Sequence, residues 1–332
     1  MPRLIYAIAG RTETALAAAI VITAIIFAFA SPYFLTAPNL VDLMEAHSVT
    51  TILAAGVFVV LVSGGIDISF TATASATQYL AAYLITSQTL PAIPALAIAA
   101  ALGIAMGCIN ALLIYFLRVG SIIITIATSS IYYALLIYFT NAEEIYNLPD
   151  WWSNGISFLR YETADGDIVK ITLPIVIMIA VLGLTQYLMN RTRIGRQAFA
   201  LGGNPEAASR VGIDVLKVQL FAYGYLGLLA AIAGIVQAGR VHQAVPTAMN
   251  GEELSVLAVA ILGGASLVGG IGSTGGVILG VLFLAMLQNG LNLLGVSSYF
   301  FGVVIGLAIL ISVGMTGYAE KYVRGRRSKR MA

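Results

Sequence analysis

Few side chains in this sequence of 332 residues are of a type that carries out chemistry, and those few lie far apart. His47 and His242 are the only histidines and Cys108 is the only cysteine, so neither a metal-ligand spacing nor an intrachain disulfide is available. No histidine or acid is suitably placed beside a serine or cysteine to form a nucleophile–base pair. The phosphate-binding pattern G-x-x-x-x-G-K-[S/T] is absent as well. The chain is therefore predicted not to be an enzyme, to hydrolyse no ATP itself, and to need no cofactor and no metal.

One glycine pattern, G-x-G-x-x-G at Gly270, Gly272 and Gly275, resembles a dinucleotide-binding turn. That interpretation requires a preceding strand and an acidic residue about 20 positions later. Here the pattern lies between two long apolar runs, and no acid occurs between Glu253 and Glu320. Close helix packing, or a break between two helices, is the better interpretation.

The segment SGGIDIS contains the only acidic residue between positions 46 and 142, Asp67. The apolar run before it has about 16 residues and rises about 24 Å as a helix, less than a hydrocarbon core of about 30 Å. We therefore expect either that Gly64 and Gly65 break the helix within the membrane or that the helix continues beyond them. Asp67 or Ser69 then either caps the next helix or lines a polar pathway, and the two roles are compatible.

A second glycine-rich segment, at 251–276, precedes polar residues that interrupt apolar runs. Its expected helix-break glycines are Gly263, Gly264, Gly269 and Gly270. The expected pathway residues, besides Asp67 and Ser69, are Asn110, Asn289 and Asn292. Such amides either hydrogen-bond between helices or contact a solute.

A polar segment at 191–215 carries the signals of a short helix outside the membrane. Asn204 is a good N-cap, Pro205 suits the first helical position, and Gly212 stops the helix. Because joining two spans does not need 25 residues, we expect a cytoplasmic partner to grip this segment, the alternative being a solvated connector. The residues assigned to that contact are Gly202, Gly203, Asn204, Pro205, Glu206, Ala207, Ala208 and Gly212.

The elements that must position these residues follow from composition. Hydrophobic residues make up 59% and charged residues 10% of the chain, and the mean hydropathy is +0.94. So few charges cannot cover a soluble protein, which excludes soluble enzymes and nucleic-acid binders. The runs predict an all-α polytopic membrane protein in one domain, 1–332, surrounded by lipid, with broken helices and about ten spans. Those spans are 14–34, 48–63, 69–88, 92–117, 121–140, 171–190, 216–239, 254–268, 274–295 and 298–317.

The distribution of basic residues predicts the orientation. With the N-terminus inside, 14 of the 17 Lys and Arg residues fall on the cytoplasmic side, as the positive-inside rule requires. Both termini are then cytoplasmic. The long loop 141–170 is external, with Trp151 and Trp152 at the interface, while the coupling loop 191–215 and the basic tail 318–332 are internal.

Taken together, these motifs resemble the membrane subunits of ribose-type bacterial ATP-binding-cassette (ABC) importers, the carbohydrate branch of a larger family that includes branched-chain amino acid permeases. The resemblance runs from about residue 50 to 317. It rests on SGGIDIS, on GRQAFALGGNPEAASRVGI, and on EELSVLAVAILGGASLVGGIGSTGGVILG with LQNGLNLLGVSSY. The chain departs from the family pattern at Phe70 and Thr71, at Glu252, and at 119–122, where the common proline is missing.

The resemblance implies a multi-pass permease in the bacterial inner membrane that moves a small sugar or related polar solute from the periplasm to the cytoplasm by alternating access. Its implied partners are a separate ABC ATPase, a second permease subunit, identical or different, and a periplasmic solute-binding protein. Two alternatives stay open. One is a permease of the same fold for an amino acid or another non-sugar solute, and the other is a proton-coupled secondary transporter.

Overall fold

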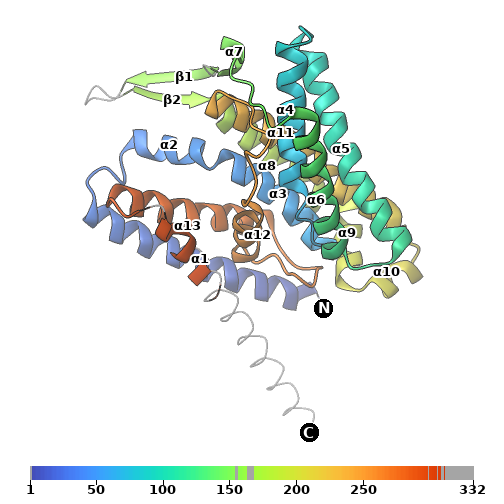
Figure 1. Cartoon of the computed structure of the whole chain (residues 1–332). Coiled ribbons are helices and arrows are strands. Elements are labelled where there is room, and N and C mark those ends of the chain that lie inside the picture. Colours follow the sequence, from blue (N-terminus) through green and yellow to red (C-terminus); the bar gives the residue numbers. More distant parts are fainter. Residues whose placement is uncertain are drawn as a thin grey trace.

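The computed structural model describes residues 2–153, 156–162, 168–297, 299–304, 306–307 and 310, and it is mainly helical (Figure 1). Its elements in chain order are α1 (Pro2–Ala30), α2 (Ala37–Ala46), α3 (Ser48–Val62), α4 (Phe70–Thr86), α5 (Ala92–Leu117), α6 (Ser121–Thr140), α7 (Asp150–Ser153), β1 (Ser157–Glu162), β2 (Ile168–Thr172), α8 (Leu173–Arg191), α9 (Arg193–Gly203), α10 (Pro205–Arg210), α11 (Val215–Val241), α12 (Glu253–Leu262) and α13 (Thr274–Leu293).

Six of these helices are long and apolar enough to cross a membrane: α1, α5, α6, α8, α11 and α13. A seventh span is possible if α2 and α3, which meet at 49°, form one broken span. The chain is thus a polytopic helical membrane protein, as predicted. Three predicted spans contain helices shorter than the span itself. Helix α3 in 48–63 has 15 residues, α4 in 69–88 has 17, and α12 in 254–268 has 10. The predicted span 298–317 lies largely, and the tail 318–332 entirely, outside the described residues.

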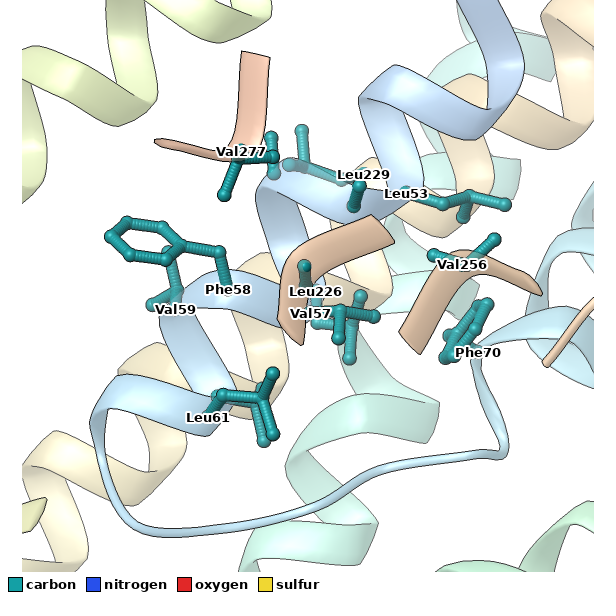
Figure 2. Close-up of a cluster of buried hydrophobic side chains, with 14 of the residues drawn as sticks. Leu53, Val57, Phe58, Val59, Leu61, Phe70, Leu226, Leu229, Val256 and Val277 are labelled. Carbon is teal, nitrogen blue, oxygen red and sulfur yellow. The ribbon is translucent and has the colours of Figure 1, made fainter. Parts of the chain in front are cut away.

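Helix α3 is the centre of the fold. All its residues except Thr50 are buried, which is why its sequence has no polar stripe. It contacts α8, α11, α12 and α13. Figure 2 shows how side chains from four other helices surround it, namely Phe70 of α4, Leu226 and Leu229 of α11, Val256 of α12 and Val277 of α13.

Helices α5 and α11 approach each other through glycines. A side chain at Gly103 or Gly107 of α5 would collide with the backbone of α11, and one at Gly227 would collide with α5. Small residues four positions apart allow such close backbone contact in membranes. The long helices α4, α5, α6 and α11 form one side of the molecule in Figure 1.

A second group of helices consists of α1, α2 and α13 (Figure 1). Leu16, Ile20 and Phe27 of α1 pack with Ala285 and Met286 of α13 in a cluster separate from the one around α3. Helix α13 belongs to this second group and also contacts α3 and α12 in the centre of the fold. This helix therefore links both parts of the fold.

The loop 141–170 contains structure that the sequence did not predict. Strands β1 and β2 pair antiparallel as a hairpin, after the short helix α7. Trp151 is partly exposed and stacks on Trp152. Trp152 instead is buried, and its Nε1 donates a hydrogen bond of 3.0 Å to the Ile235 carbonyl of α11. The structure thus leaves Trp151 on the surface of the chain and packs Trp152 against α11.

Candidate functional site

The predicted break after α3 is present. The helix ends at Val62, and Gly64 has φ +88°, a left-handed conformation that glycine adopts without strain. The amides of Gly64 and Gly65 turn back to the carbonyls of Leu61 and Val60 at 2.9 and 3.1 Å. This is the usual way in which a glycine satisfies the last carbonyls of a helix. Seven residues then separate the two helices, and α4 begins at Phe70.

Asp67, Ser69 and Asn110 lie together in one buried cluster. An Asp67 Oδ1 accepts hydrogen bonds from both the amide and the hydroxyl of Ser69, each 2.7 Å long. The Asn110 side-chain amide, from α5, donates to the Ser69 hydroxyl at 2.7 Å and to Asp67 Oδ2 at 3.4 Å. These contacts brace the segment before α4 against α5, but neither the Asp67 nor the Ser69 side chain accepts a hydrogen bond from the first amides of α4.

The other two predicted pathway residues lie elsewhere. Asn289 of α13 pairs with Asn39 of α2 through two reciprocal amide hydrogen bonds of 3.0 and 2.9 Å. Asn289 is thus engaged between helices, and Asn39 is a partner that the sequence did not reveal. Asn292 is exposed. The structure therefore brings together three of the five residues and leaves two apart.

The break after α12 repeats the one after α3. Gly264 has φ +88°, and the amides of Gly264 and Ala265 turn back to the carbonyls of Ile261 and Ala260 at 2.8 and 3.0 Å. Gly269 and Gly270 also have positive φ, at +94° and +74°. All four predicted glycines of this segment therefore lie in the non-helical segment between α12 and α13, which Gly263 begins.

The polar segment 191–215 forms two helices, of which the second matches the prediction. Asn204 caps α10, its Oδ1 accepting from the Ala207 amide at 2.9 Å, and Pro205 is the first helical residue. Gly212, with φ +83°, follows the helix. The preceding helix α9 was not predicted, and its last residues are Gly202 and Gly203, for which the sequence suggested a sharp turn leading into α10.

One predicted contact residue of α10 faces the wrong way for a partner. Ala208 is buried against the rest of the chain. The exposed residues of the helix are Pro205, Glu206, Ala207, Ser209 and Arg210, and they are followed by Val211, an apolar side chain that is 78% exposed. The face available to a partner is therefore the one around Ala207 and Val211.

Helix α9 ends directly against both helix breaks. A side chain on Gly202 would collide with the Val62 carbonyl, and it would come within 2.9 Å of the Gly64 amide. On the other side, the Gly270 amide donates a hydrogen bond of 2.9 Å to the Val62 carbonyl, and a Cβ on Gly269 would lie 2.7 Å from the Gly64 Cα. We call Gly64, Gly202, Gly269 and Gly270 the glycine junction. It joins the base of α9 and α10 to the ends of α3 and α12.

A cavity of about 250 Å³ lies elsewhere, between α3, α11, α12 and α13. Its polar lining consists of His47, Thr50, Gln237, Arg240, Glu252, Ser255 and Gln288, and it includes none of the five predicted pathway residues. Partial burial, and then the neighbouring charge of Glu253, raise the pKa of the Glu252 carboxyl. The sequence offered two signals for this cavity, the departure from the family pattern at Glu252 and the polar Gln288 within an apolar run.

Comparison with known proteins shows that the chain is similar to permease subunits of transport systems. Residues 39–313 match the family described as the permease component of branched-chain amino acid transport systems. The chain is 35% identical to the ribose import permease protein of Escherichia coli over 91% of this chain and 92% of that protein, and 35% identical to the one of Bacillus subtilis over 88% of each. It is 31% identical to the D-allose transport system permease protein of Escherichia coli over 91% of this chain and 90% of that protein. No solved structure matches the chain.

Proposed function

The chain belongs to the family of permease components of branched-chain amino acid transport systems, and from this we propose that it is the permease subunit of an ABC importer for a small sugar. The observation that carries the proposal is the similarity to ribose and D-allose permeases along nine-tenths of the chain. The absence of a phosphate-binding loop from the whole sequence supports a separate ATPase.

We place the chain in the bacterial inner membrane as a single permease domain with about ten spans and both termini in the cytoplasm. The basic residues of the 191–215 segment and of the C-terminal tail support this orientation. A second permease subunit completes the pathway, and a periplasmic binding protein delivers the solute. The bundle exposes the solute to one side at a time, as alternating access requires.

In this proposal the ATPase binds to the α9–α10 segment. Its exposed α10 face supplies the contact, and the glycine junction connects that face to the breaks after α3 and α12. A displacement of α10 is therefore passed to two non-helical segments, which can change conformation without unfolding a helix. The Asp67 cluster holds one of these segments to α5.

Transport assays test the proposal. The chain would be produced with its ATPase and its binding protein in bacteria that lack their own ribose, allose and galactose importers, and uptake of radiolabelled D-ribose, D-allose, D-galactose and L-leucine would be measured. We expect ATP-dependent uptake of at least one sugar and none of leucine. Uptake of leucine alone would favour the amino-acid alternative. Uptake by vesicles that have a proton gradient but no ATP would favour a secondary transporter.

A further inference from the structure

The polar side chains of the 250 Å³ cavity have unused hydrogen-bonding capacity. In the part of the chain that the structure describes, the side chains of Thr50, Gln237, Ser255 and Gln288 make no hydrogen bond to another residue, although each is only partly exposed. Within apolar helices, polar groups normally find partners. Four such groups around one cavity indicate that their partner is something that enters it.

The groups around the cavity complement a polyhydroxyl compound. Each glutamine offers a donor and an acceptor, Glu252 accepts, and Arg240 donates. One Arg240 nitrogen is already bonded to the Ala46 carbonyl at 3.1 Å, which orients the guanidinium. Sugar hydroxyl groups both donate and accept, so they match such a mixed set better than a purely anionic or cationic solute does.

The volume of the cavity and its apolar lining also fit a monosaccharide. At about 30 Å³ for each water, a volume of about 250 Å³ holds roughly eight water molecules. It admits a monosaccharide, whereas an oligosaccharide is too large. Leu53, Val256 and Val259 supply apolar surface for the C–H face of a sugar ring.

We propose that this cavity is a solute-contact site for a neutral monosaccharide, with Gln237, Gln288, Arg240 and Glu252 as its main hydrogen-bonding groups. The proposal rests on the proposed function, and it adds the residues that the sugar meets during transport. Because the cavity is formed by α3, α11, α12 and α13, a movement of α3 and α12 at their breaks alters its shape. The site therefore binds and releases the sugar in step with the cytoplasmic α9–α10 segment.

Two matched glutamines on α11 provide the test. Gln237→Leu removes the hydrogen-bonding group from the cavity, while Gln219→Leu makes the same change 18 residues earlier, five turns away on the same face of the helix and outside the cavity lining. Uptake of D-ribose, D-allose and D-galactose would be measured with the complete importer, at equal amounts in the membrane. We expect Gln237→Leu to lower uptake about three- to tenfold, the loss of one or two hydrogen bonds, and to change the ratio among the sugars. Gln219→Leu should behave as the wild type.

A labelling experiment gives a second result that does not depend on uptake. In a Cys108→Ala background, Ser255→Cys should react with a charged methanethiosulfonate reagent applied to both sides of the membrane, whereas Ser75→Cys, at a fully buried position, should not. Unchanged uptake and sugar ratios in Gln237→Leu, equal losses in both glutamine variants, or an unreactive Ser255→Cys would each overturn the site. Failure of the wild-type importer to take up any of the three sugars would instead contradict the proposed function.

Discussion

At the scale of single residues, Asp67 shows what local sequence can and cannot reveal. Its isolation among apolar residues, shortly after two glycines, singled it out in the sequence. Its partner Asn110 is 43 positions away on another helix, so no local pattern could connect them. The same applies to Asn39 and Asn289, which are 250 positions apart. Sequence thus found polar groups in apolar runs, but only the packing of helices determined which of them meet.

The main effect of replacing Asp67 should be on the stability of the folded protein, and any loss of transport should follow from it. Asp67→Ala leaves the amide and hydroxyl of Ser69 without their acceptor, at a cost of about 1–3 kcal/mol for each unpaired buried group, whereas Asp67→Asn keeps one acceptor oxygen. We expect a lower melting temperature in detergent for Asp67→Ala than for Asp67→Asn. Asp42→Ala, at an exposed position, is the control and should match the wild type. Normal stability of Asp67→Asn with abolished uptake would point to the pathway role instead.

The Asn39–Asn289 pair offers a second measurement at this scale. Two reciprocal amide hydrogen bonds join α2 to α13. A double-mutant cycle with Asn39→Ala and Asn289→Ala should give a coupling free energy near the membrane average of about 0.6 kcal/mol for each bond. Unfolding in a mixed detergent titration would provide the four free energies. Strictly additive effects would show that the pair contributes no mutual stabilisation.

At the scale of elements, the helices with local start and stop signals were predicted best. Helix α10 matches its expected cap, first residue and stop because Asn204, Pro205 and Gly212 act within a few residues of one another. The orientation of its faces was not predictable in the same way. Ala207 and Ala208 are adjacent and identical in type, yet one is exposed and the other buried, because α10 lies against the core.

This difference determines how docking on α10 should be tested. Ala207→Glu adds bulk and charge to the exposed face while keeping a residue with good helix propensity, so it should abolish uptake and co-purification of the ATPase without reducing the amount of permease in the membrane. Ala207→Ser is the conservative companion and should retain both. Ala208→Glu would bury a charge and disturb folding whether or not a partner binds. Wild-type ATPase binding by Ala207→Glu would contradict docking at this face.

At the scale of the whole molecule, composition predicted the polytopic helical class, because a chain with 10% charged residues has too few charges to cover a surface exposed to water. The arrangement of the helices around α3, and the separate group of α1, α2 and α13, could not be predicted in this way. Apolar residues are interchangeable in a hydropathy pattern, so burial on every side of α3 was not visible. Likewise, the glycine junction combines three segments whose glycines, taken separately, indicated helix breaks and a partner contact but not that these segments meet.

The glycine junction leads to a prediction about how movement of the ATPase is coupled to transport. Gly202→Ala would place a methyl group against the Val62 carbonyl, where the backbones leave no room, so α9 must move away from α3 at an overpacking cost of about 1–3 kcal/mol. Gly203→Ala is a close control, since its nearest neighbour, the Gly270 Cα, would be 4.0 Å away. We expect Gly202→Ala to bind the ATPase, through an unchanged α10 surface, but to lose at least nine-tenths of its uptake.

ATP hydrolysis in the Gly202→Ala complex should then no longer respond to the loaded binding protein, because the displaced α9 does not pass movement between the breaks and α10. Gly203→Ala should keep both uptake and this stimulation. The two measurements, made on the complete importer in proteoliposomes, separate a loss of coupling from a loss of assembly, since an unassembled complex would show no bound ATPase at all. Full uptake and stimulation in Gly202→Ala would mean that α9 and the breaks move independently, and that force reaches the pathway by another route.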